Sequence, residues 1–159
     1  MLAIGRGPAR TALGALIWLW AGVLIGVSFL AAPAKFAAPS LSLPVAMDVG
    51  RHEFGVLNLV EIGLAIAVLA LAALARPART IWLGLGIAAL IVAAQTVWLL
   101  PLLAARAALI IQGGTPPPAP WHRLYAGAEL LKLLTLLVTG WLMLRALIKA
   151  EGVAGEFRP

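Results

Sequence analysis

The sequence predicts an all-α, polytopic integral membrane protein whose four transmembrane helices form an antiparallel bundle. Of its 159 residues, 63% are hydrophobic and only 11% are charged, and the mean hydropathy is +1.03. A soluble domain is typically about half apolar and about a quarter charged. Four apolar stretches reach the roughly 20 residues with which a helix crosses a bilayer, and none alternates with the period of two typical of transmembrane strands. We therefore expect residues 1–159 to form a single domain.

The first predicted span covers about residues 11–32. It follows the basic stretch "MLAIGRGPAR", and "AAPA" at residues 31–34 is similar to a signal-peptide cleavage site. The apolar run is longer, however, than the roughly 7–15 residues of a signal sequence. We therefore expect a transmembrane helix that is retained in the mature protein.

The other three spans are predicted at about residues 54–75, 80–105 and 121–144. The turn between the second and third spans, "ARPART", is too short to separate them. These two spans should therefore form an antiparallel hairpin.

The two remaining connections are longer and contain proline. Residues 33–52 hold Pro33, Pro39 and Pro44. We predict that they form a kinked interfacial segment, which leads through an entry helix into the second span. Residues 112–120, "QGGTPPPAP", contain several helix breakers and should stay extended.

The lysines and arginines predict the orientation in the membrane, since cytoplasmic connections carry an excess of them. With four spans, the two termini and the second connection share one side. That side carries Arg6, Arg10, Arg76, Arg79, Arg145, Lys149 and Arg158, whereas the other carries Lys35, Arg51, Arg106 and Arg123. This bias places both termini in the cytoplasm. The richness in Ala, Gly, Pro and Arg is typical of a bacterial protein, so we expect the bacterial inner membrane.

Charge and cysteine content exclude several functions. The net charge is +6 and the sequence pI about 11.2. Because the basic residues lie at the ends of apolar runs, we expect them to meet lipid headgroups rather than nucleic acid. The chain has no cysteine, which excludes disulfides, thiolate metal sites and cysteine nucleophiles. Two histidines and scattered carboxylates do not form a metal-ligand cluster, and no catalytic motif is present.

A polar stripe runs along the fourth predicted span. At about 100° per residue, His122, Tyr125, Glu129 and Lys132 fall on one face within about 80°. Lys132 lies about 15 Å deeper than His122, from a rise of about 1.5 Å per residue. This depth places Lys132 close to the middle of the bilayer.

The second and third predicted spans carry polar residues at matching depths. Arg51, Asn58 and Glu61 have the same spacing as His122, Glu129 and Lys132 (i, i+7, i+10), and both spans run in the same direction. Glu61 should therefore lie level with Lys132. The third span adds Gln95 and Arg106, which are eleven residues apart and nearly on one face.

These charges should face the interior of the bundle, because a charge at the bilayer centre costs about 2.5–3.5 kcal/mol on insertion scales. The simplest pairing joins Lys132 to Glu61, with Glu129 bonded to Asn58, Gln95 or an outer arginine. Glu129 and Lys132 are also i, i+3 neighbours and can pair within one helix. Each of these arrangements is compatible with polar contacts that only hold the helices together.

Four segments carry a family resemblance: "GVSFLAAPAKFAAPS", "DVGRHEFGVLNLVE", "QTVWLLPLLAAR" and "WHRLYAGAELLKL". They resemble the transmembrane protein 205-like family of small four-helix membrane proteins, which includes bacterial relatives with a domain of unknown function. The resemblance covers about a third of the chain and implies the four-helix architecture rather than an activity. The layout is also similar to membrane protoporphyrinogen oxidases, which bind haem in a four-helix bundle and have an essential histidine in the first helix; the first predicted span here has no histidine.

We predict from the stripe that the protein binds or transports a small solute or protons through a polar cavity, and we favour this function over an enzymatic one without excluding the latter. Arginines at the mouth favour an anionic or carboxylate-bearing ligand, and a transport role predicts a homo-oligomer, because four spans enclose little volume. One alternative is a membrane enzyme or haem- or quinone-binding protein acting on a lipophilic substrate. Another is a structural subunit. No cofactor is identified. The predicted site comprises Arg51, Asn58, Glu61, Gln95, Arg106, His122, Tyr125, Glu129 and Lys132.

Overall fold

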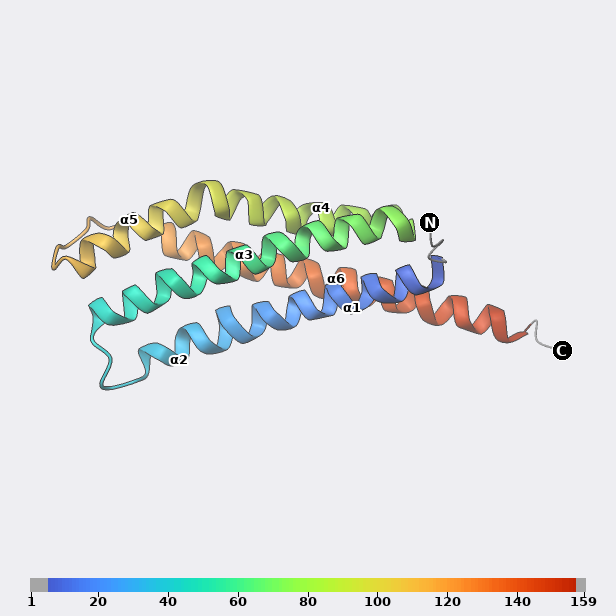
Figure 1. Ribbon diagram of the computed structural model, residues 1–159, viewed down its shortest axis with the longest axis horizontal. Helices are drawn as coiled ribbons and strands as arrows, with labels where there is room; N and C mark the ends of the chain where they lie inside the picture. Colours follow the sequence, from blue (N-terminus) through green and yellow to red (C-terminus); the bar gives the residue numbers. More distant parts are fainter. Residues whose placement is uncertain (1–5, 157–159) are drawn as a thin grey trace.

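The computed structural model describes the backbone of residues 6–156 and the side chains of residues 7–150, and the described chain is helical apart from three connections (Figure 1). Two of the long helices each contain one π-helical stretch, called η1 in the first long helix and η2 in the third. In order, the elements are α1 (Arg6–Leu24), η1 (Ile25–Ala31), α2 (Ala32–Phe36), α3 (Leu43–Ala75), α4 (Arg79–Ala94), η2 (Gln95–Leu99), α5 (Leu100–Ile111) and α6 (Trp121–Glu156).

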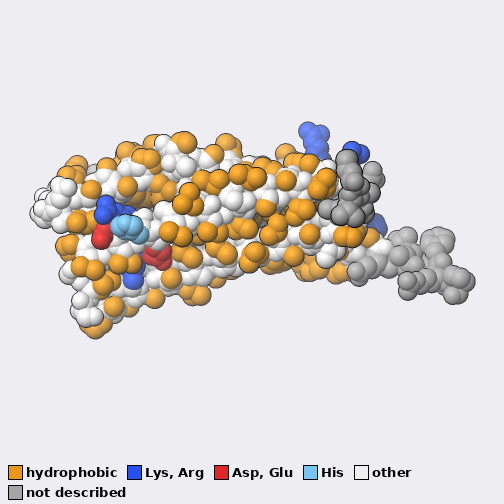
Figure 2. Space-filling model, in the orientation of Figure 1, with side chains coloured by type: hydrophobic (Ala, Val, Ile, Leu, Met, Phe, Trp, Pro, Cys, Tyr) orange, Lys and Arg blue, Asp and Glu red, His pale blue; other side chains and the backbone are white. Residues whose placement is uncertain are grey.

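Four helices are long and apolar enough to cross a membrane, as the sequence predicts. Each is 30 or 33 residues long, with a mean hydropathy between 1.8 and 2.3 over its most suitable part. Hydrophobic side chains cover the middle of the visible face, and charged side chains lie toward the two ends (Figure 2). The four helices are Gly7–Phe36, Leu43–Ala75, Arg79–Ile111 and Trp121–Ala150.

The four long helices lie side by side and run alternately in opposite directions (Figure 1). The first helix packs against α3 and α6, while the third packs against the same two helices from the other side. Consequently α3 and α6 are diagonal in the bundle. The start of α1, the turn at residues 76–78 and the end of α6 lie at one end. Arg158, which is counted among the basic residues that predict the orientation, lies outside the described residues.

The connection between the first two spans is shorter than predicted. Most of the predicted interfacial segment, residues 33–52, is helical. Pro33 lies near the end of the continuous helix Gly7–Phe36, directly after η1, whereas Pro44 lies in the first turn of α3. Proline fits the first helical turn, where its missing N–H has no partner to lose and its φ is already helical. Only residues 37–42 interrupt the helices there. Residues 112–120 contain no helix, as predicted.

The two halves of the bundle are packed differently. Near the termini, an apolar core fills the interior; its largest members are Trp20, Leu13, Ile17, Leu85 and Met143, each at most 1% exposed. The core ends on each helix close to the polar residues Glu61, Gln95 and Lys132. Beyond them lie the two π-helical stretches.

One close approach joins α4 to α6 in the packed half. A Cβ atom added at Gly84 would lie 2.0 Å from Thr139 Oγ1 and 3.2 Å from Thr139 Cβ. The Thr139 hydroxyl donates to the Thr135 carbonyl at 2.7 Å within α6. Gly84 therefore allows a helix approach that no larger residue permits, as small residues commonly do in membrane bundles.

We predict that Gly84→Ala destabilises the bundle by about 1–3 kcal/mol, the usual cost of overpacking. Gly86→Ala is a matched control, because a Cβ there meets nothing within 4 Å. It should be neutral or slightly stabilising. The free energy of unfolding, measured by SDS titration in mixed micelles, checks both. Equal stability of the two variants would contradict the close approach.

Candidate functional site

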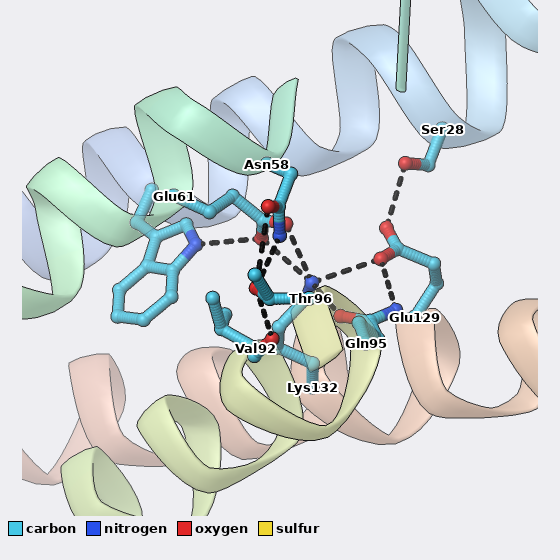
Figure 3. A network of polar contacts seen from close by, with 9 residues as sticks. Ser28, Asn58, Glu61, Val92, Gln95, Thr96, Glu129 and Lys132 are labelled. Carbon is cyan, nitrogen blue, oxygen red and sulfur yellow. Dashed lines mark hydrogen bonds and ion pairs between the residues drawn. The ribbon is translucent and has the colours of Figure 1, made fainter. Parts of the chain in front are cut away.

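A buried ammonium group, that of Lys132, lies at the centre of the site. Lys132 is 0% exposed, and its Nζ lies 2.7 Å from the Glu61 carboxylate, 2.7 Å from Gln95 Oε1 and 2.8 Å from Glu129 Oε1 (Figure 3). An ammonium carries three N–H donors. Each donor of Lys132 therefore has an acceptor.

Further donors complete the shells of the two carboxylates. Glu61 accepts from the indole N–H of Trp20 at 2.9 Å. Glu129 accepts from the Gln95 amide at 2.7 Å and from the Ser28 hydroxyl at 2.6 Å. No buried side-chain nitrogen or oxygen among the described residues lacks a partner. With both carboxyls ionised, the formal charge of this cluster is −1.

All four spans contribute to this set of residues, which we call the charged cluster: Trp20, Ser28, Glu61, Gln95, Glu129 and Lys132. Glu129 and Lys132 share a face of α6, because residues three apart are neighbours on a helix. The Glu61–Lys132 pair joins the diagonal helices α3 and α6 across the bundle. Ser28 lies in η1 and Gln95 begins η2.

A smaller polar pair lies beside the cluster. Asn58 donates to Thr96 Oγ1 at 2.9 Å, and the Thr96 hydroxyl donates to the Val92 carbonyl at 2.8 Å (Figure 3). Asn58 precedes Glu61 by one helical turn, and Thr96 directly follows Gln95. The pair therefore links α3 to η2 on the side of the cluster away from the apolar core.

A cavity of about 380 Å³ opens in the half of the bundle away from the termini. Its walls come from α2, α3, η2, α5 and α6. They are largely apolar, and include Phe36, Met47, Phe54, Leu100 and Leu103. Its polar lining consists of Lys35, Arg51, Asn58, Thr96, His122 and Tyr125.

The cavity stops short of the charged cluster. None of Glu61, Gln95, Glu129 and Lys132 is among the described residues that line it. Asn58, Thr96 and Tyr125 lie between, and the Tyr125 ring, 3% exposed, packs edge-on against Phe54 with 5.2 Å between centroids. Glu61, Glu129 and Lys132, three residues of the predicted site, therefore do not line this cavity.

The three basic residues of the predicted site that lie away from the charged cluster, Arg51, Arg106 and His122, are placed differently from one another. His122 is exposed and lines the cavity. Arg51 also lines it, but its Nε lies 2.7 Å from Asp48 Oδ1, so its charge is already paired. Arg106 is not among the lining residues and donates instead to the Pro117 carbonyl in the loop. Arg106 therefore tethers the connection between α5 and α6.

The predicted site lacks four residues of this region, which are Trp20, Ser28, Lys35 and Thr96. Trp20 and Ser28 lie in a span with no ionisable side chain near its centre, so no charge pattern marked them. Thr96 adjoins Gln95, but it is a small uncharged residue, so no charge pattern marked it either. Lys35 pairs with Glu53 and lies over the Phe54 ring, 5.3 Å from its centroid.

Comparisons with protein-family models, with curated proteins and with solved structures give no match for this chain.

We predict that Lys132→Met destabilises the protein by about 3–5 kcal/mol, because it leaves two buried carboxylates without their shared cation. Lys149→Met is the control, since Lys149 is exposed on the same helix. SDS-titration unfolding measures both. Adding Glu61→Gln to Lys132→Met should recover part of the loss by removing one buried charge. If Lys132→Met matches Lys149→Met in stability, the ammonium does not hold the cluster together.

Proposed function

We propose that this protein binds and transports a small lipophilic, carboxylate-bearing solute in the cavity between α3, α5 and α6. The observation that carries the proposal is that residues lining the cavity adjoin residues of the charged cluster on the second, third and fourth long helices. Asn58 is one turn from Glu61, Thr96 adjoins Gln95, and Tyr125 is one turn from Glu129. A solute that displaces these lining residues would therefore act on the immediate neighbours of the cluster.

The chemistry of the cavity supports this class of solute. Its volume lies in the range of about 300–1,000 Å³ that is typical of small-molecule sites, and its walls are mostly apolar with a few polar groups. Lys35, Arg51 and His122 supply donors for a carboxylate. Because Lys35 and Arg51 already pair with Glu53 and Asp48, apolar contact supplies most of the affinity, and the donors orient the solute.

A structural role for the cluster is the competing proposal. It is supported by the complete hydrogen bonding of the cluster and by its separation from the cavity. The two proposals differ in what Glu129→Gln changes. If the cluster is only structural, Glu129→Gln changes the stability of the protein alone. If the cluster responds to the solute, Glu129→Gln also changes solute binding or transport.

We further infer that the protein lies in a bacterial inner membrane with both termini in the cytoplasm. The excess of lysine and arginine at the end of the bundle that carries the termini supports this orientation. In this orientation the cavity faces the periplasm.

This orientation predicts the accessibility of single cysteines, which the cysteine-free chain allows without background. In intact spheroplasts, a membrane-impermeant maleimide should label Thr115→Cys, in the loop before α6, but not Ala78→Cys, in the turn before α4. Ala78→Cys should react once the membrane is permeabilised. The reverse pattern would place the termini outside.

A cavity-filling variant tests solute binding. A Cβ at Gly55 meets nothing within 4 Å, and Gly55 lines the cavity. Gly55→Leu should therefore fill the cavity without disturbing the backbone. Gly63→Leu is the matched control, because Gly63 on the same helix has equally open surroundings and does not line it.

The probe is decanoic acid bearing a diazirine, photo-crosslinked to the protein in lipid nanodiscs. Crosslinks to residues 100–107 should be displaced by unlabelled decanoate. They should fall several-fold in Gly55→Leu and persist in Gly63→Leu, as peptide mass spectrometry measures. Crosslinks that no competitor displaces, or that Gly55→Leu leaves unchanged, would contradict binding in this cavity.

A further inference from the structure

The two buried carboxyls of the charged cluster differ in whether their partners can accept a hydrogen bond. Glu61 receives hydrogen bonds from the Trp20 indole at 2.9 Å and from the Lys132 ammonium at 2.7 Å. An indole N–H and an ammonium only donate. Among its contacts, Glu61 therefore has no group to which a carboxylic acid could donate.

One oxygen of Glu129 has similar partners. Its Oε1 accepts from Lys132 at 2.8 Å and from the Gln95 amide nitrogen at 2.7 Å. The Gln95 amide cannot be reversed, because its oxygen accepts from Lys132 at 2.7 Å. Both partners of Oε1 are therefore held as donors.

The other oxygen of Glu129 has a partner that can reverse its role. Oε2 lies 2.6 Å from the Ser28 hydroxyl, which can either donate or accept. Ser28 is only half-buried, whereas Glu129 is 2% exposed. The Ser28 side is thus the less enclosed side of this carboxyl.

We propose that Glu129 is a proton-binding site and that Ser28 accepts the hydrogen bond of the bound proton. A hydronium ion transfers its proton to Oε2 and leaves as water, and the Ser28 hydroxyl turns from donor to acceptor. A serine in a helix can donate to the carbonyl four residues earlier, which here is that of Leu24. One O–H bond forms, no electrons are transferred, and the formal charge of the cluster changes from −1 to zero.

Two charged groups share the surroundings of Glu129. On α6 it contacts Lys132, and the neutral phenol of Tyr125 lies one turn away. On α3, Glu61 shares the same ammonium. The contacts from η1 and η2, Ser28 and Gln95, are uncharged. The net charge of −1 on the cluster is costly in an interior that excludes water. One bound proton removes this charge.

The backbone supplies a second indication. Both residues that contact Glu129 from other spans lie in π-helical stretches, Ser28 in η1 and Gln95 in η2. Such stretches are rare and are frequent at functional sites. The inference goes beyond solute binding, because Glu129 can take up a proton whether or not the cavity is occupied.

Infrared difference spectroscopy tests this assignment, because a protonated carboxyl has its own C=O stretching band. The spectra are recorded on the full chain in lipid nanodiscs while the pH is varied. Aspartate keeps the charge of the cluster but moves the carboxyl. Glu129→Asp should therefore shift the band of the buried acid, and Glu61→Asp should leave it in place. Surface carboxyls contribute equally to every variant and cancel in the differences.

The hydroxyl is tested separately. Ser28→Ala should shift the same band, because the acid loses its acceptor, and Ser28→Thr should restore its position. Trp20→Phe, which removes a donor to Glu61, is the matched control and should leave the band unchanged. A band that follows Glu61→Asp and Trp20→Phe would move the proton to Glu61. Absence of any buried-acid band in the wild type would overturn the proposal.

Discussion

The requirement that a buried ammonium be surrounded by acceptors organises this bundle. Lys132 is fully buried, and its three hydrogen bonds reach Glu61 on α3, Gln95 on η2 and Glu129 on its own helix. An unpaired charge in this position would cost several kcal/mol. The pairing therefore fixes the rotation of α3, η2 and α6 toward one another and connects the two diagonal helices.

The same cluster separates two regions with different packing. Toward the termini, an apolar core fills the bundle, with close contacts such as that of Gly84 with Thr139. Away from the termini, the helices leave a cavity of about 380 Å³, bounded next to the cluster by Asn58, Thr96 and Tyr125. A compact half thus supports a more open one, and the charged residues lie where they meet.

Part of the site could be predicted from the sequence, because helical periodicity and depth are properties of a single chain. Equal spacing in two parallel spans placed Glu61 level with Lys132, and the structure pairs them at 2.7 Å. The alternatives for Glu129 were Asn58, Gln95, an outer arginine and Lys132 itself. The structure joins Glu129 to Gln95 and Lys132 together, and Asn58 bonds Thr96 instead. Spacing alone cannot choose among these partners, because they lie on different helices.

The sequence by itself determined four membrane-length helices and the burial of their charges, because length, hydropathy and the cost of a charge in lipid need no knowledge of neighbours. Tertiary structure decided which side chains complete the site. Trp18 and Trp20 are alike in sequence, yet Trp18 is 42% exposed and Trp20 is buried against Glu61. Ser28 contacts a carboxylate 101 residues away. Such contacts depend on how helices rotate and pack against one another, which the periodicity of one helix does not contain.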